Sequence, residues 1–141
     1  MIQIEKMDNI ENIILNFFDS DRHIVSITLF GSYAKNLATE TSDVDIAILW
    51  ERSHIPSILT LIDWQEDLSS RLQKEVDLIC LNTASPIIGM QAYKDGKVLV
   101  IKNPHEYAIY QMVLFTDYAE LKELRGPMEK NILKRKYYDR P

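Results

Sequence analysis

The stretch from Leu29 to Leu49, LFGSYAKNLATETSDVDIAIL, constrains the fold of this 141-residue chain more than any other part of it. It predicts a strand, a tight glycine turn, a short helix, and a second strand that opens with two carboxylates one residue apart. Side chains at positions i and i+2 of a strand point to the same face, so we expect Asp43 and Asp45 to stand side by side. Two carboxylates placed so near each other raise each other's pKa unless a cation balances their charge. Their hard oxygens suit Mg²⁺ or Mn²⁺.

The Gly31-Ser32 turn adds a second chemical element. It follows the apolar run of residues 25–30 and precedes the helix-compatible residues 33–35. Glycine lets the backbone approach a ligand closely, and the unpaired N–H groups at a helix start bind phosphate oxygens. The Ser32 hydroxyl can donate a further hydrogen bond to the same anion. A phosphate-binding turn beside paired carboxylates indicates metal-assisted phosphoryl or nucleotidyl transfer.

These residues carry a family resemblance. Gly31-Ser32, followed by Ser42-Asp43-Val44-Asp45, resembles the GS…SDxD signature of the DNA-polymerase-β-like nucleotidyltransferases, and is most similar to the minimal nucleotidyltransferases among them. That family usually offers a third carboxylate on a later strand, and Asp77 stands at the expected place. The resemblance covers roughly residues 25–101, and Lys35-Asn36 stands where Arg-Gly is frequent.

The resemblance implies a fold and a set of roles. The fold would be the nucleotidyltransferase fold, an α/β (α+β) arrangement of a small mixed sheet flanked by helices, with a long C-terminal helix. Asp43 and Asp45 would hold two Mg²⁺ ions, with Mn²⁺ as an alternative, and Asp77 would hold the catalytic one. ATP would be the nucleotide substrate. The candidates for binding its phosphates are Gly31, Ser32, Lys35 and Ser42.

Outside the motif, helical and strand periodicities alternate along the chain. Helices are expected over residues 5–18, from Pro56 at the first helical position to Leu72, and from Ser85-Pro86 to the Asp95-Gly96 turn, with strands over 76–81 and 98–101. This alternation predicts an α/β sheet of mixed direction. Trp64 is interpreted as a packing residue.

The histidines have separate interpretations. His23, at the border of the first strand, is taken as a surface residue rather than a ligand. His105 has no His or Cys at metal-binding spacing and is not expected to bind a metal.

A long helix is expected over residues 104–124. Asn103 is a suitable N-cap, and Gly126-Pro127 predicts a stop. Val113 and Phe115 lie off the main apolar stripe of this expected helix. Two interpretations are open: the helix buries a second face against a partner, or it has one wide face that packs on the core.

We therefore divide the chain into two parts. Residues 1–103 would form a minimal nucleotidyltransferase domain. Residues 104–141 would form a C-terminal helix and basic tail that pack on this domain, on a partner, or on both.

The net charge of −5 is unevenly distributed. Residues 1–121 hold 9 Lys and Arg against 18 Asp and Glu, whereas residues 122–141 hold 7 against 3. The acidic body argues against direct nucleic-acid binding, which needs a basic footprint. The basic tail suits an acidic partner surface or a solvated helix end.

Other features bear on location. The N-terminus lacks a basic signal-peptide region, and no apolar run approaches the roughly 20 residues of a membrane span. The single cysteine, Cys80, cannot form an intrachain disulfide and suits a reducing compartment. We expect a cytoplasmic protein without a membrane partner.

The nucleotide acceptor is not encoded in the motif. Polymerase, tailing and antibiotic-modifying relatives carry further domains that present their acceptors, whereas this chain looks like the minimal nucleotidyltransferase antitoxins paired with HEPN ribonuclease toxins. The resemblance implies an enzyme that transfers AMP from ATP to a tyrosine of a HEPN-type toxin, in a hetero-oligomer. Two alternatives stay open: a non-catalytic module that masks its partner by contact, and a nucleotidyltransferase for a small molecule such as an antibiotic.

Overall fold

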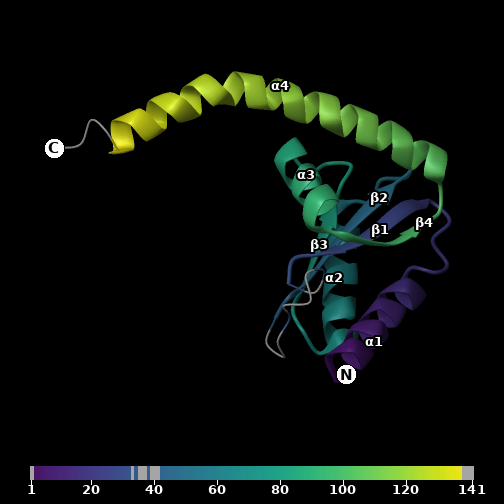
Figure 1. Ribbon diagram of the computed structural model, residues 1–141. Helices are drawn as coiled ribbons and strands as arrows, with labels where there is room; N and C mark the ends of the chain where they lie inside the picture. The colour runs from purple at the N-terminus through teal and green to yellow at the C-terminus, as the bar shows by residue number, and fades with distance from the viewer. Residues whose placement is uncertain (1, 33, 35–37, 39–41, 138–141) are drawn as a thin grey trace.

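The computed structural model describes residues 2–32, 34, 38 and 42–137. These residues form four helices and four strands (Figure 1). None of the described helices is long and apolar enough to cross a membrane. The elements are α1 (Ile2–Phe17), β1 (Ile24–Phe30), β2 (Val44–Trp50), α2 (Ile58–Leu72), β3 (Val76–Cys80), α3 (Pro86–Asp95), β4 (Lys97–Ile101) and α4 (Pro104–Tyr137).

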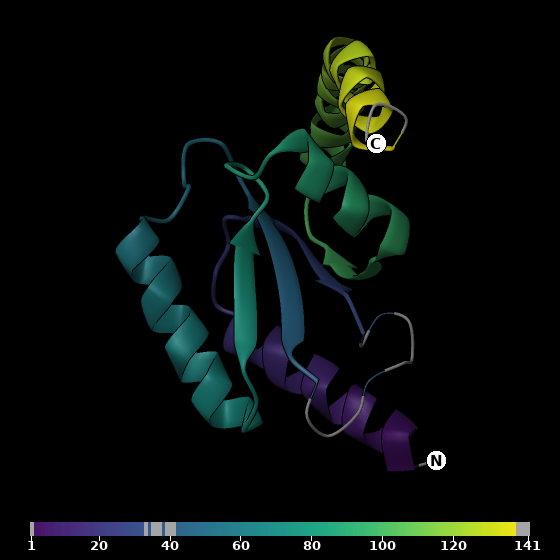
Figure 2. The same ribbon diagram turned by 90° about the vertical axis from the view of Figure 1, so that its left-hand side faces the viewer.

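The four strands form one sheet in the order β3-β2-β1-β4. β1 pairs antiparallel with both β2 and β4, whereas β2 and β3 run parallel. Helices α1 and α2 lie on one side of the sheet, and α3 and α4 lie on the other (Figures 1 and 2). The mixed sheet flanked by helices and the long C-terminal helix confirm the predicted fold class.

Helices cover both faces of the sheet, which explains why its central strands are almost wholly apolar. Every residue of β1 is buried, and in β2 all but Asp45 are buried. Alternate residues of β2 belong to two cores, with Ile46 and Ile48 facing α1 and α2 and Ala47 and Leu49 facing the α3 side. β2 is therefore buried on both faces beyond its carboxylate end.

Local capping chemistry sets several helix ends as expected. The Ser85 side chain accepts the N–H of Ile88, and Gly96 ends α3. Asn103 Oδ1 accepts the N–H of Glu106 at 3.2 Å at the start of α4. The predicted caps of α3 and α4 are therefore confirmed.

The start of α2 differs from the prediction. The helix begins at Ile58, and Ser57 is its N-cap, with the side chain accepting the N–H of Thr60 at 3.2 Å. Pro56 therefore precedes the cap instead of occupying the first helical position. A serine hydroxyl that satisfies an otherwise unpaired N–H group outweighs the preference of proline for the first turn.

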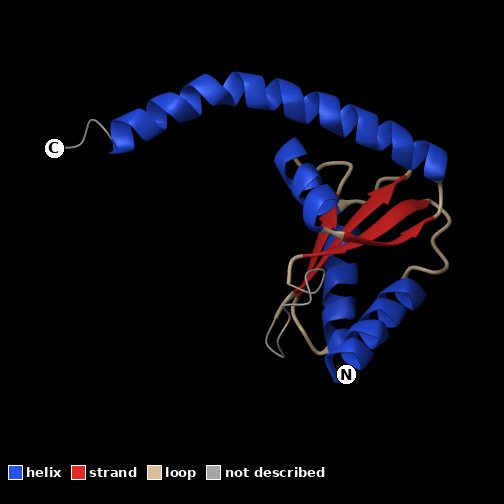
Figure 3. Ribbon diagram, viewed as in Figure 1, coloured by secondary structure: helices blue, strands red, loops and turns tan. Residues whose placement is uncertain are grey.

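The predicted stop at Gly126-Pro127 is wrong, because α4 continues to Tyr137. Figures 1 and 3 show it as one long, curved helix that extends well beyond the body of the molecule. A proline inside a helix removes one hydrogen bond and costs about 3 kcal/mol. Residues 128–136, MEKNILKRK, are mostly strong helix formers, which favours continuation beyond that point.

The two tryptophans pack together against the α1 side of the sheet. Trp50 is buried, and its ring stacks with Trp64 at a centroid distance of 6.0 Å. Trp64 also contacts Phe18 edge to face at 5.9 Å. The interpretation of Trp64 as a packing residue is confirmed.

Candidate active site

The carboxylates predicted from the motif lie at the N-terminal ends of β2 and β3. Asp45 is directly opposite Asp77 in the parallel pairing of these strands. Paired residues on adjacent strands point to the same face, and the strands lie about 4.8 Å apart. Asp43 precedes β2 by one residue, and its side chain is exposed, as is that of Asp77. The sheet thus brings all three predicted aspartates to one edge.

Asp45 is the most enclosed of the three. Burial raises the pKa of its carboxyl group, and the negative charges of Asp77 and then Asp43 raise it further. Two negatively charged carboxylates thus lie near a third that is partly buried, and this arrangement destabilises the folded protein when no cation is bound. A bound cation would remove that penalty.

Gly31 lies directly against this carboxylate. It follows Phe30, which pairs with Asp45 across β1 and β2. A Cβ atom added to Gly31 would overlap Oδ2 of Asp45, and its φ of +73° lies in the left-handed region that other residues adopt reluctantly. Conformation and close approach therefore both require glycine here.

The other predicted phosphate-binding residues are placed unevenly. Ser32 is exposed immediately after Gly31, and Ser42 is partly buried immediately before Asp43. Lys35 lies outside the described residues, as do most positions of the expected short helix. Gly31, Ser32 and Ser42 thus lie next to the carboxylate-bearing segments.

The donor set fits a hard divalent cation. It consists of carboxylate oxygens from adjacent strands, which are the ligands that Mg²⁺ and Mn²⁺ prefer. Burial and the nearby charges of Asp77 and Asp43 raise the pKa of Asp45, and a bound cation would favour its charged form. In the described part of the chain, however, only His23, Glu51 and His54 have one ligand atom each within 4.8 Å of the others. Cation binding at the aspartates would therefore draw their side chains together.

The cluster of His23, Glu51 and His54 is not among the predictions from the sequence, which interpret His23 as a surface residue. A signal was available, because His23 immediately precedes β1 and Glu51 immediately follows β2. The antiparallel pairing of Ile24 with Trp50 brings these flanking residues together. His54 gave no comparable signal, since a loop positions it.

A separate cavity of about 270 Å³ lies between α4 and the C-terminal end of β2. It includes Trp50, Arg52 and Asn82 in its lining, and so lies away from Asp45. Tyr110 also lines it, and burial raises the pKa of that phenol to about 12. This cavity carries no like-charge cluster of the kind found at Asp45.

Comparison with known proteins places these residues in a family. The family model described as "Polymerase beta, Nucleotidyltransferase" matches residues 12–105, which include the glycine turn and all three aspartates. This chain belongs to that nucleotidyltransferase family. The resemblance inferred from GS…SDVD is therefore confirmed.

Individual relatives match shorter segments of this nucleotidyltransferase. Protein MJ0126 of Methanocaldococcus jannaschii is 47% identical over 60 residues, which cover 43% of this chain and 59% of the relative. The protein adenylyltransferase MntA of Shewanella oneidensis is 35% identical over 75 residues, covering 52% of this chain and 51% of the relative. The chain thus spans between half and two thirds of the length of these relatives.

Structural similarity extends further along the nucleotidyltransferase chain. A crystal structure of a toxin–antitoxin with AMP-PNP contains a chain that superimposes with a TM-score of 0.79 at 26% sequence identity. The superposition covers 87% of this chain and 98% of that one. The two chains therefore share most of their fold, beyond the segment that carries the motif.

Proposed function

We propose that this nucleotidyltransferase is an antitoxin that transfers AMP from ATP to a tyrosine hydroxyl of a HEPN-type RNase toxin. The observation that carries the proposal is the opposition of Asp45 and Asp77 across parallel strands, with the backbone of Gly31 held against Asp45. An apolar strand pair gains nothing in stability from these charges, so their presence in this geometry favours a catalytic role. In this proposal the protein acts in the cytoplasm.

Two comparisons support the choice of reaction and partner. The Shewanella oneidensis relative is named a protein adenylyltransferase, and the structure that superimposes on 87% of this chain is a toxin–antitoxin that contains AMP-PNP. AMP-PNP is an analogue of ATP. These facts concern the relatives, and they favour ATP and a protein acceptor for this chain over a small-molecule acceptor.

In this proposal Asp43 and Asp45 hold two Mg²⁺ ions, Asp77 holds one of them, and Mn²⁺ can replace Mg²⁺. When bound, the ions offset the charge of the triphosphate and stabilise charge that develops on the reacting oxygens. The backbone of Gly31 and the hydroxyl of Ser32 orient the β- and γ-phosphates, with Lys35 and Ser42 as further contacts. None of these binding roles requires a change in the strand pairing described above.

The transfer step is a substitution at the α-phosphorus of ATP. The tyrosine oxygen forms a new bond to this phosphorus, and the bond to the bridging oxygen breaks to release pyrophosphate. The proton of the tyrosine hydroxyl passes to the exposed carboxylate of Asp77. It then passes to solvent.

The C-terminal part of the chain has a corresponding role in this proposal. Residues 1–103 form the catalytic domain, and residues 104–141 pack on both the domain and the toxin in a hetero-oligomer. Leu114 of α4 is buried against the body, whereas Met112 and Val113 are 70% and 54% exposed. The helix thus has apolar side chains left over for a partner after packing on its own domain.

The test is transfer of label from α-labelled ATP to a co-purified partner in the presence of Mg²⁺. We expect the wild-type protein to label the partner, and Asp43→Asn to abolish the label. Asp63→Asn is the matched control, because Asp63 is an exposed aspartate of α2 outside the site. Labelling that persists in Asp43→Asn would contradict the catalytic assignment. A partner that stays bound without acquiring label would instead indicate a module that masks it by contact.

A further inference from the structure

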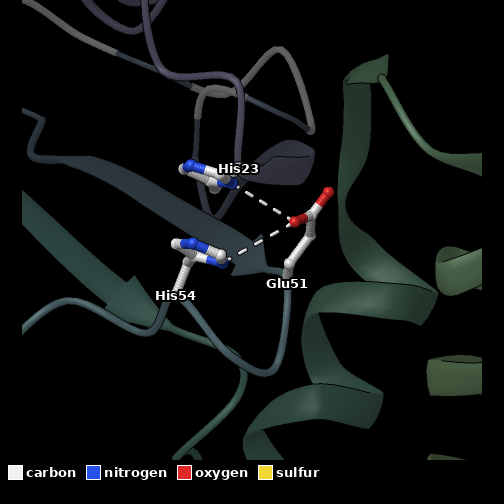
Figure 4. Close-up of side chains that lie close together, drawn as sticks. All are labelled: His23, Glu51 and His54. Atoms are coloured by element: carbon white, nitrogen blue, oxygen red, sulfur yellow. Dashed lines mark hydrogen bonds and ion pairs between the residues drawn. The ribbon is translucent and has the colours of Figure 1, made fainter.

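A second constellation of potential ligands lies at the opposite end of β2. His23, Glu51 and His54 point toward one another, and both Nδ1 atoms face the same carboxylate oxygen (Figure 4). His23 Nδ1 lies 3.3 Å from Glu51 Oε2, and His54 Nδ1 lies 3.8 Å from it. We propose that these three side chains bind a divalent transition-metal ion of the Zn²⁺ class.

The backbone holds the three residues in place independently of their side chains. The N–H of Glu51 donates to the carbonyl of His23 at 2.8 Å, and the N–H of His54 donates to the carbonyl of Glu51 at 2.9 Å. The N–H of His23 donates to Asp21 Oδ1 at 2.9 Å. The geometry is thus set by the pairing of β1 with β2 and by a tight turn after β2.

The spacing of the ligand atoms suits such an ion. Zn²⁺ binds imidazole nitrogen and carboxylate oxygen at about 2.0–2.2 Å, so two ligands of a tetrahedral site lie roughly 3.4 Å apart. The observed separations of 3.3 and 3.8 Å bracket this value. Two imidazoles with one carboxylate also form a known donor set for catalytic zinc, which leaves a coordination position open.

The side chains have room to adjust to the ion. The two imidazole rings are stacked, with centroids 3.5 Å apart and planes within 3°. Coordination of one ion by both Nδ1 atoms requires the two rings to tilt out of their parallel stacking. The side chains of His23 and His54 are 43% and 46% exposed, so solvent borders the space into which they would turn.

The surrounding charges favour a cation. With neutral imidazoles the cluster carries the single negative charge of Glu51. The guanidinium of Arg52 interacts with Glu106, with Nε 3.8 Å from Oε2, instead of pairing with Glu51. The Ser53 hydroxyl also lies 2.8 Å from His54 Nδ1. An ion would replace this exposed hydrogen bond.

This site is separate from the proposed nucleotidyl-transfer site. Glu51 follows Asp45 by six residues along β2, which corresponds to roughly 20 Å in an extended strand. The donor sets also differ, because imidazole nitrogen favours Zn²⁺ over Mg²⁺. The zinc-site proposal therefore does not depend on the function of the aspartates.

The test is Zn²⁺ titration of the metal-free protein by calorimetry, with excess Mg²⁺ present to occupy the aspartates. We expect one Zn²⁺ per chain, and at least roughly tenfold weaker binding for His54→Asn and for Glu51→Gln. His105→Asn is the matched control, because His105 is the third histidine and is exposed on α4. Asp45→Asn is also expected to bind Zn²⁺ as the wild type does.

Histidine-ring NMR provides the second measurement. Zn²⁺ should shift the ring signals of His23 and His54 and leave those of His105 in place. Equal affinity in wild type and His54→Asn would overturn the proposal, as would equal weakening by His105→Asn. Absence of both binding heat and ring shifts would show that the cluster is only a hydrogen-bonded surface group.

Discussion

The two ends of β2 differ in how well their polar and charged groups are paired. At its start, Asp45 is partly buried with two further carboxylates that raise its pKa. At its end, Trp50 has every backbone polar group satisfied: its N–H donates to Asn82 Oδ1 at 2.9 Å, and its carbonyl accepts from Asn82 Nδ2 at 2.8 Å. Its indole N–H donates to Asp21 Oδ2 at 3.0 Å. The start of β2 thus carries clustered carboxylates, whereas hydrogen bonds at its end hold the strand in place.

The contrast teaches where function and stability reside in this fold. Residues 46–50 are buried on both faces and hold the strand rigidly. A rigid strand can carry an unfavourable charge cluster at its edge, because its position does not depend on that cluster. Variants at the carboxylate end should therefore change activity most, and variants at the anchored end should change the free energy of unfolding most.

The largest expected effect is that of Asp45→Asn on nucleotidyl transfer. Removal of a carboxylate that binds the catalytic ions should lower the rate of partner labelling roughly a thousandfold, equivalent to about 4 kcal/mol of activation free energy. The initial rate with α-labelled ATP measures this, with Asp63→Asn as the control. An unchanged rate would remove Asp45 from the catalytic site.

Gly31→Ala should lower both activity and stability. The new Cβ would overlap the Asp45 carboxylate and displace it, while the left-handed backbone would cost about 1–2 kcal/mol. Gly31→Asn separates these causes, since asparagine tolerates the backbone conformation and still carries a Cβ. We expect both variants to lose at least roughly tenfold in labelling rate. Recovery of the wild-type rate in Gly31→Asn would show that conformation alone requires the glycine.

Asn82→Ala should show the opposite pattern at the anchored end. It leaves the N–H and carbonyl of Trp50 without their partner, which should lower the free energy of unfolding by about 2 kcal/mol. Urea unfolding measures the loss, with Asn16→Ala on the exposed face of α1 as the control. The labelling rate of the folded variant should stay within roughly twofold of wild type. A labelling rate lowered well beyond twofold, with little change in the free energy of unfolding, would contradict this division between the two ends of β2.

Asp45 should also give a pH dependence of stability in the absence of divalent ions. Its pKa in the folded protein is raised above 3.8, so the folded state retains a proton that the unfolded state has lost. Stability from this group is present below about pH 3.8 and declines as the pH rises through the folded-state pKa. Urea unfolding in EDTA over this window should show a decline that Asp45→Asn reduces. Identical profiles for the two proteins would contradict the raised pKa.

The smallest expected effect is that of Ser26→Ala in β1. Ser26 is fully buried, and its Oγ has no hydrogen-bond partner among the residues that the structure describes. Removal of an unsatisfied hydroxyl should change the free energy of unfolding by less than about 0.5 kcal/mol or increase it slightly. Thermal and urea unfolding measure this. A loss above about 1 kcal/mol would reveal a polar contact that the present arrangement does not contain.

Local chemistry explains why much of the secondary structure could be predicted. The caps at Ser85 and Asn103 operate within three residues, and the apolar runs of β1 and β2 are visible as continuous stretches. Such signals act over a few positions and are legible without the fold.

The errors came where two local signals competed. Ser57 prevailed over Pro56 at the start of α2, and α4 ran through Gly126-Pro127. Only part of α2 packs on the sheet, because Leu68 and Leu72 are buried whereas Ile58 and Leu59 are each 75% exposed. Periodicity identifies an apolar face but not how much of its length meets the sheet.

The amino-acid sequence alone was enough to assign the family and nominate Gly31, Asp43, Asp45 and Asp77. Only the tertiary structure decided that β3 lies parallel beside β2, which sets Asp77 opposite Asp45. It also decided that β1 and β2 pair so that His23 meets Glu51 and His54. The physical reason is that strand order follows from covering both faces of the sheet with helices from distant parts of the chain. That constraint acts between segments far apart in sequence, so no local motif records it.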